Sequence, residues 1–207
     1  MSDTRSIPVK EALNAGWALT KKHFGVLLAT IIILAIPVGV SAYIYLRPFT
    51  GSIYVDFLSV LLFLYLLGGS AKLSLAAVRG QNPSLGNLFS LSPLAYLNLI
   101  LFLILYFILI PIGFFLLVIP GFIVLLMFFF GSYFIVDKQS GFLSSFGQSK
   151  RLTAGRKGTL FSWLIVQTLL LTLAAIPFGL GLLVFGPIIF LANAYIYDTL
   201  TKRDGIK

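Results

Sequence analysis

The sequence contains no cysteine, only one histidine and few charged residues. The absence of cysteine excludes disulfide bonds, thiolate nucleophiles and thiolate metal sites. The single histidine, His23, has no second histidine and no acidic cluster near it, so no metal centre and no cofactor are expected. Charged residues make up 10% of the chain and hydrophobic residues 59%, which is more than a soluble domain can bury. The composition therefore indicates an integral membrane protein.

Acidic residues are also scarce, and the formal net charge is +9. Such a charge could suggest nucleic-acid binding, but the basic residues lie beside apolar runs and form no stripe with stacking aromatic residues. We therefore expect no nucleic-acid partner. Attraction to anionic lipids on the cytoplasmic side of a membrane explains the charge better, at about 1 kcal/mol for each nearby basic residue.

Six apolar runs dominate the chain, each close to the roughly 17 to 25 residues that a helix needs to cross a bilayer. They cover residues 24–46, 53–78, 94–118, 119–136, 160–176 and 180–197. Fourteen of the 15 lysine and arginine residues fall on one side of this pattern, and only Arg47 falls on the other. The positive-inside rule then predicts an all-α, polytopic bundle of six transmembrane helices with both termini in the cytoplasm. We expect residues 1–207 to form a single integral membrane domain. The first 23 residues lack the apolar core and cleavage site of a signal peptide.

Two segments outside the spans, residues 7–22 and 142–157, have the periodicity of amphipathic helices. In each, basic residues gather on one arc and apolar residues on the other, which is typical of helices in the cytoplasmic membrane interface. Packing against the end of the protein's own bundle is the alternative, and both can hold together. The residues expected at the interface are Trp17, Lys21, Lys22, Lys150, Arg151, Arg156 and Lys157.

Internal similarity predicts three parallel repeats of an entry segment, an outgoing span and a returning span. The first and third entry segments share a Leu-Thr pair, a basic cluster and a glycine, and residues 83–90 form a reduced entry for the middle unit. An Ile-Pro-x-Gly motif recurs toward the outer end of each outgoing span, with its prolines at Pro37, Pro111 and Pro177. Chance recurrence is the alternative, since proline and glycine are common in membrane helices.

Prolines are expected to shape the outer ends of the spans. Pro37, Pro111 and Pro177 each predict a kink or a stop, because proline removes a helical hydrogen bond. Pro120 and Gly121 predict a tight turn between the third and fourth spans. We expect this turn to be buried in the bundle, because unsatisfied backbone groups are costly in lipid. A re-entrant pair over residues 94–136 is the rival interpretation, disfavoured because both stretches are long enough to cross.

Several short motifs resemble one family of bacterial membrane proteins. The motifs are Pro120-Gly121-Phe122, Val136-Asp137, the segment Ser149 to Gly158 with Phe161, and upstream Arg79-Gly80, Ser84-Leu85 and Leu88-Phe89. Together they resemble the glycerophosphoryl diester phosphodiesterase membrane-domain-like family and related inner-membrane proteins of the YciC type. The resemblance implies a helical domain of unsettled function in the bacterial inner membrane. We expect no phosphodiesterase activity, since the family's larger members carry it in a separate soluble domain.

Polar residues within or at the ends of the spans are the candidate site residues. Asp137 and Asp198 lie at corresponding cytoplasmic ends and are expected to be structural, pairing with basic neighbours or capping the next segment. Lys72 lies well inside a span, where it either snorkels to the cytoplasmic face or lines a cleft for an anion or lipid headgroup. The remaining candidate binding residues are neutral: Asn98, Gln167 and Asn193. Interhelical hydrogen bonds, at about 0.6 to 2 kcal/mol each, explain them first and a polar substrate path second.

No phosphate-binding loop, serine elbow or paired carboxylates are present, so we expect no enzyme. The favoured function is a non-enzymatic membrane protein that organises lipids or membrane partners, including a second copy of itself. A small transporter or channel component for a polar or anionic small molecule is the alternative. A water-filled cavity that reaches Lys72 would favour transport, whereas a closed, dry bundle would favour the first function.

Overall fold

The computed structural model describes residues 9–46, 53–176 and 179–206, and every regular element in these ranges is a helix. The predicted all-α class with six apolar helices long enough to span a membrane is confirmed. These spans are α2 (Phe24–Tyr45), α3 (Ile53–Val78), α4 (Pro93–Leu116), α5 (Val118–Met127) together with α6 (Gly131–Lys138), α8 (Lys157–Ala175) and α9 (Leu182–Arg203). The shorter elements are α1 (Val9–Lys22), the 3-10 helix η1 (Leu85–Phe89) and α7 (Phe142–Thr153).

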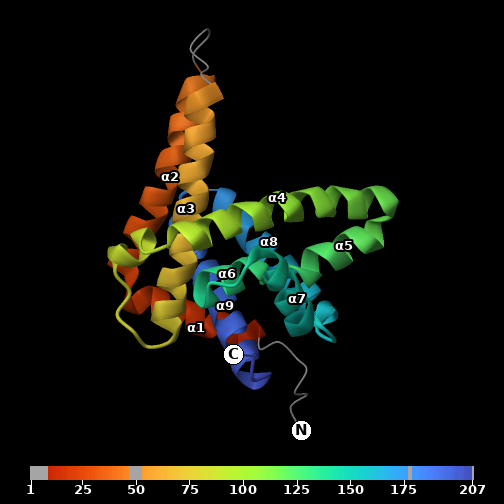
Figure 1. Cartoon of the computed structure of the whole chain (residues 1–207). Coiled ribbons are helices and arrows are strands. Elements are labelled where there is room, and N and C mark those ends of the chain that lie inside the picture. Colours follow the sequence, from red (N-terminus) through yellow and green to blue (C-terminus); the bar gives the residue numbers. More distant parts are fainter. Residues whose placement is uncertain (1–8, 47–52, 177–178, 207) are drawn as a thin grey trace.

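The helices α2 to α5 form two hairpins that point in different directions from a common base (Figure 1). The α2–α3 pair extends one way, and the α4–α5 pair runs across it. Helix α9 lies at the base and packs against α1, α2, α3 and α8. Trp163, Phe130, Phe134 and Tyr197 are fully buried there and give the base a large aromatic core. The outer parts of both hairpins remain exposed, with side-chain exposure reaching 80% at Tyr45 and 92% at Phe115.

The fourth predicted span is broken at residues 128–130, between α5 and α6. Side chains of α7 satisfy the backbone groups that the break frees. The Met127 carbonyl accepts hydrogen bonds from Ser149 Oγ at 2.9 Å and from Thr153 Oγ1 at 3.1 Å, and the Phe130 amide donates to Ser149 Oγ at 3.2 Å. The break is therefore stabilised by side chains of α7, the next helix in the chain.

A single non-helical residue, Leu117, joins α4 to α5. The turn was predicted at Pro120 and Gly121, but both residues lie inside α5. The prediction that the turn is buried in the bundle is wrong, because residues 116–118 are all exposed, Leu117 by 70%; of Pro120 and Gly121, only Gly121 is buried. The turn leaves few backbone groups unsatisfied, since the Leu117 amide donates to the Gly113 carbonyl and the Gly121 amide to the Leu117 carbonyl. Pro120 has no amide hydrogen to satisfy. The backbones of α4 and α5 approach closely at Gly113 and Gly121. A Cβ on Gly113 would lie only 3.0 Å from the Gly121 Cα, so the small size of glycine permits this approach.

The other prolines do not end their helices. Pro37 lies inside α2 and Pro111 inside α4, and each helix continues beyond it, so neither proline is a stop. Pro177 lies outside the described residues.

Both amphipathic segments contain helices, with bounds that differ from the expected ones. Helix α7 ends at Thr153 rather than near Lys157, and Gly155 follows in the left-handed region with φ of 73°. Helix α1 packs against α9 and buries Ala12, Gly16 and Thr20. A Cβ on Gly16 would lie only 2.7 Å from the Ile188 carbonyl oxygen, so only glycine permits this approach.

Candidate functional site

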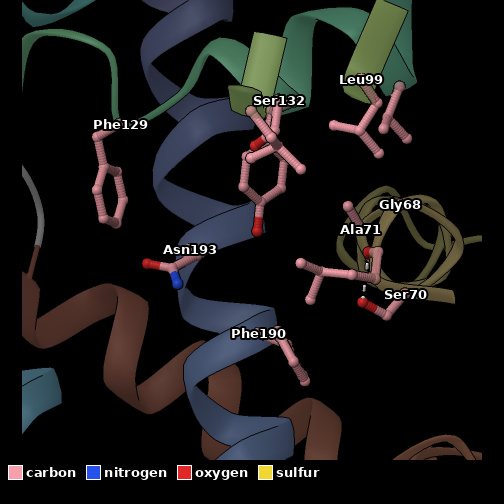
Figure 2. Close-up of a pocket in the computed structure, with 12 residues that line it drawn as sticks. Gly68, Ser70, Ala71, Leu99, Phe129, Ser132, Phe190 and Asn193 are labelled. Carbon is pink, nitrogen blue, oxygen red and sulfur yellow. Dashed lines mark hydrogen bonds between the residues drawn. The ribbon is translucent and has the colours of Figure 1, made fainter. Parts of the chain in front are cut away.

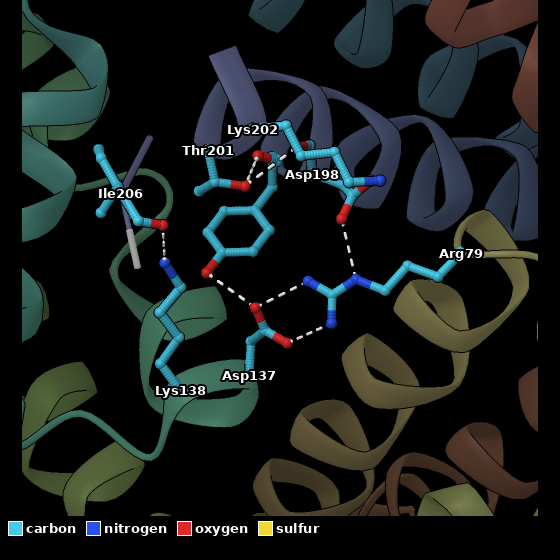
Figure 3. Close-up of polar contacts among 8 residues, drawn as sticks. Arg79, Asp137, Lys138, Asp198, Thr201, Lys202 and Ile206 are labelled. Atoms are coloured by element: carbon cyan, nitrogen blue, oxygen red, sulfur yellow. Dashed lines mark hydrogen bonds and ion pairs between the residues drawn. The ribbon is translucent and has the colours of Figure 1, made fainter. Parts of the chain in front are cut away.

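The C-terminal ends of α3, α6 and α9 meet at the base, where Arg79, Asp137 and Asp198 form the centre of a shared charged cluster (Figure 3). The Arg79 guanidinium binds both Asp137 oxygens, with nitrogen–oxygen distances of 2.6 and 2.8 Å. Its Nε donates to Asp198 Oδ1 at 2.8 Å. Bidentate contacts of this kind are among the stronger ion pairs in proteins. One arginine therefore ties three helices together.

Other groups complete this cluster, which we call the Arg79 cluster. Lys202 binds Asp198 Oδ2 at 2.6 Å, and the Tyr197 hydroxyl donates to Asp137 at 3.3 Å. The two carboxylate side chains are nearly buried, at 11% and 6% exposure, whereas Arg79 is 34% exposed. The hydrogen bond to Asp137 is the main cause that raises the pKa of Arg79. Two cations balance two acids, so the cluster has little net charge to offer a ligand.

A second ion pair lies nearby and was not expected from the sequence. Arg156 binds Asp204 through two hydrogen bonds of 2.6 and 2.7 Å and also donates to the Leu152 carbonyl. The hydrogen bond to Asp204 is the main cause that raises the pKa of Arg156. Arg156 is one of the residues expected at the membrane interface, and its buried side chain links the α7–α8 bend to the end of α9.

The segment between α3 and α4 folds back along α3 and does not stay at the base. A Cβ on Gly69 would lie 2.1 Å from the Leu88 carbonyl oxygen, so η1 rests directly on the α3 backbone. The Tyr65 hydroxyl donates to the Phe89 carbonyl at 2.8 Å. Since a helix rises about 1.5 Å per residue, η1 reaches roughly 15 Å along α3 from the Arg79 end.

Lys72 lies beneath this folded-back segment. Its ammonium donates to the Ser90 carbonyl at 2.7 Å, and its side chain is half-buried. It lines a cleft of about 190 Å³ whose other polar lining residues include Arg79, Gln81 and Asn87. We call this the Lys72 cleft. Of the two alternatives for Lys72, snorkelling to the cytoplasmic face or lining a cleft, the described contacts favour the cleft, because the ammonium has a protein carbonyl partner and lines this space.

A central cavity of about 200 Å³ adjoins the cleft between α3, α4, α6 and α9 (Figure 2). Its wall is mainly apolar and includes Leu67, Leu99 and Phe190, with Ser70, Ser132 and Asn193 as polar members. The side-chain amide oxygen of Asn193, Oδ1, accepts a hydrogen bond of 2.7 Å from Trp163 Nε1. Val136 lines both the central cavity and the Lys72 cleft.

The four predicted binding residues therefore separate into two groups. Lys72 and Asn193 line these adjoining spaces, whereas Asn98 and Gln167 line neither. Asn98 accepts a hydrogen bond of 3.0 Å from the Phe142 amide, so it links α4 to the start of α7. Gln167 lies half-buried on α8, and its carbonyl oxygen is one of the buried atoms without a partner among the described residues.

The remaining basic residues lie on the outside of the base. Lys150 and Lys157 line an open depression of about 470 Å³ beside Met127 and Gly155. The exposed residues Lys21, Lys22, Trp17 and Arg151 lie on α1 and α7. The Lys21 ammonium lies 5.4 Å from the Trp17 ring centroid, a cation–π contact.

Sequence reasoning identified the two acids of the Arg79 cluster but not Arg79 itself. In the sequence, Arg79 contributes only to the one-sided distribution of basic residues and to the Arg79-Gly80 motif. The signal that could have found it is the presence of one arginine and two aspartates at the ends of three returning spans on the same side of the membrane. Asp204 carried no such signal, because it lies beyond the last span.

Residues 98–199 match a known family model. The family is described as a domain of unknown function, DUF7847. The match begins in α4 and ends in α9, so it includes Asp137, Arg156 and Asp198 but not Lys72 or Arg79. No curated protein and no solved structure matches the chain significantly. The chain is a multi-pass membrane protein by its six candidate spans, and the matched family specifies no activity.

Proposed function

We propose that this chain is a non-enzymatic membrane protein that organises anionic lipids or membrane partners at the cytoplasmic face. The observation that carries the proposal is the division of its charges. The nearly buried carboxylates of Asp137 and Asp198 pair with Arg79 and Lys202 in the Arg79 cluster, which leaves these charges a structural role. The exposed charges are mostly basic and lie on α1, on α7 and at the end of α9, where they can attract lipid phosphates.

The location we propose is the bacterial inner membrane with both termini in the cytoplasm. The 14-to-1 partition of basic residues supports this orientation. The resemblance to the glycerophosphoryl diester phosphodiesterase membrane-domain-like family supports the bacterial inner membrane, and no enzymatic activity is proposed with it.

We also propose that the chain consists of three parallel repeats. The order of elements supports this, since an entry segment precedes an outgoing and a returning span in α1–α3, in η1–α6 and in α7–α9. Arg79, Asp137 and Asp198 then occupy corresponding ends of the three returning spans. The Arg79 cluster would hold the three units together.

A transporter or channel component for a polar or anionic small molecule is the second candidate. The central cavity favours it, because four helices surround this space and Asn193, Ser70 and Ser132 face it. Against it stands the mainly apolar wall, which offers a charged solute little compensation for lost hydration.

Native mass spectrometry can test the proposed function. The protein would be extracted from vesicles of equal phosphatidylglycerol and phosphatidylethanolamine, and the retained lipids identified. We expect phosphatidylglycerol to be enriched in the wild type and reduced when Lys21, Lys22, Lys150 and Arg151 are all replaced by glutamine. A control variant keeps the positive charge at these four positions, with each lysine replaced by arginine and the arginine by lysine. This variant should preserve the enrichment.

Equal retention of both lipids by the wild type would contradict the proposal. Phosphate release from protein-containing vesicles, faster than from empty ones, would favour the transporter instead.

A further inference from the structure

We infer that the central cavity and the Lys72 cleft form one binding site for an anionic glycerophospholipid. An acyl chain would occupy the cavity, and the phosphate would bind the Lys72 ammonium. The inference rests on the proposed function and adds to it a specific site and a ligand class.

The central cavity suits an acyl chain. It is lined by residues of α3 and α4, two helices that diverge into separate hairpins (Figure 1). Leucine, valine and phenylalanine side chains dominate its wall. Two of its polar groups already have protein partners, since Ser70 Oγ donates to the Leu67 carbonyl and Asn193 accepts from Trp163. An apolar ligand would therefore leave these groups satisfied.

The Lys72 cleft suits a phosphate. An ammonium has three N–H donors, and the Ser90 carbonyl accepts one of them. No acid lies within ion-pair distance of Lys72 in the described part of the chain. Arg79, beside it, is already neutralised by Asp137 and Asp198. Asp137 also lines the cleft, but its carboxylate is bound by Arg79, so Lys72 supplies one unbalanced positive charge, with the side-chain amides of Gln81 and Asn87 nearby.

The two spaces are arranged in the order that a lipid requires. The cavity contacts α3 at residues 67–71, and the cleft contacts it from Lys72 to Arg79, closer to the basic end. Val136 borders both spaces. A lipid in the leaflet at the basic end has its phosphate toward that end and its chains toward the bilayer centre. The proposed site has the same direction, with the Lys72 cleft toward the basic end and the central cavity farther from it.

Binding of three defined probes to the delipidated full chain in detergent tests this inference. The probes are dioctanoyl phosphatidylglycerol, dioctanoylglycerol, which lacks the phosphate, and glycerophosphoglycerol, which lacks the acyl chains. We expect tight binding of the phospholipid only. Lys72→Met should weaken it about fivefold, the effect of one lost basic contact, and Lys72→Arg should preserve it. Leu103→Trp, which fills the cavity, should also weaken it. Lys138→Met is the matched control, because the Lys138 ammonium also donates to a backbone carbonyl, that of Ile206, but lines neither the cavity nor the cleft, so phospholipid binding should be unchanged.

Equal phospholipid binding by wild type and Lys72→Met would overturn the inference, as would tight binding of glycerophosphoglycerol, which would indicate a site for a free anion. Circular dichroism would establish that each variant is folded. If the wild type enriches phosphatidylglycerol but Lys72→Met binds the phospholipid probe as tightly as the wild type, the proposed function stands and this site is wrong. If the wild type shows no enrichment at all, the proposed function itself fails.

Discussion

At the scale of single residues, Arg79 has the widest structural influence among the charges described here. It contacts acids that lie 58 and 119 positions later in the sequence. Sequence reasoning could place Asp137 and Asp198 at span ends and expect them to be structural. It could not assign their partner, because long-range contacts depend on how the helices pack. The same limit applies to Asp204 and Arg156.

Replacing Arg79 should destabilise the protein more than replacing any exposed basic residue. Arg79→Gln leaves Asp137 without a cationic partner and Asp198 with only Lys202. We expect a loss of about 2 to 4 kcal/mol, reduced from the cost of breaking a fully buried pair because Arg79 is partly exposed. Lys202→Met is the control, and since its side chain is 70% exposed we expect about 0.5 kcal/mol or less. Equal unfolding midpoints for the two variants in detergent would count against the cluster's role.

His23 predicts a modest dependence of stability on pH. Burial, and then the charge of Lys22, lower its pKa from 6.5 in the folded protein. The unfolded chain therefore takes up the proton first as the pH falls. The contribution of His23 to stability is complete above pH 6.5 and is lost as the pH falls through the lowered folded value. Unfolding midpoints between about pH 5 and 8 should decline more in the wild type than in His23→Gln. Parallel curves would refute this assignment.

At the scale of secondary-structure elements, the length of the apolar runs predicted the existence of the long helices well. Residues 53–78 match α3 at both ends. The break between α5 and α6 could not be predicted, because residues 119–136 read as one continuous apolar run. The break depends on hydroxyl groups of Ser149 and Thr153 that reach it only in the folded state. The folded-back η1 was missed for a related reason, since it depends on the close approach at Gly69.

Gly69 should tolerate no side chain at all. A Cβ there would overlap the Leu88 backbone, which cannot move without displacing η1. We expect Gly69→Ala to cost about 1 to 3 kcal/mol in unfolding free energy. Gly39→Ala is the matched control, because a Cβ at this other helical glycine meets nothing within 4 Å. That substitution should be neutral or stabilising by up to about 1 kcal/mol. Similar unfolding curves for both variants would show that η1 does not pack on α3 as described.

At the scale of the whole molecule, the hairpins share a base and diverge toward their tips. Two hairpins that run across each other cannot both stand parallel to the bilayer normal, so at least one of them is tilted (Figure 1). Hydropathy predicted the lengths of these helices and the side on which charges gather. It could not predict their crossing, because crossing angles depend on side-chain packing at contacts such as Gly68 and Gly131.

The account requires the basic base to face the cytoplasm and the tip of the α4–α5 hairpin to reach the opposite side. Labelling of single cysteines with a membrane-impermeant maleimide tests this most directly, since the chain has no cysteine of its own. The positions are Leu117 at the hairpin tip and Lys150 on α7, both exposed. We predict that Leu117→Cys reacts in intact cells and that Lys150→Cys reacts only after the membrane is permeabilised. Labelling of Lys150→Cys from outside would reverse the orientation, and a Leu117→Cys that reacts only after permeabilisation would show that the α4–α5 hairpin does not cross.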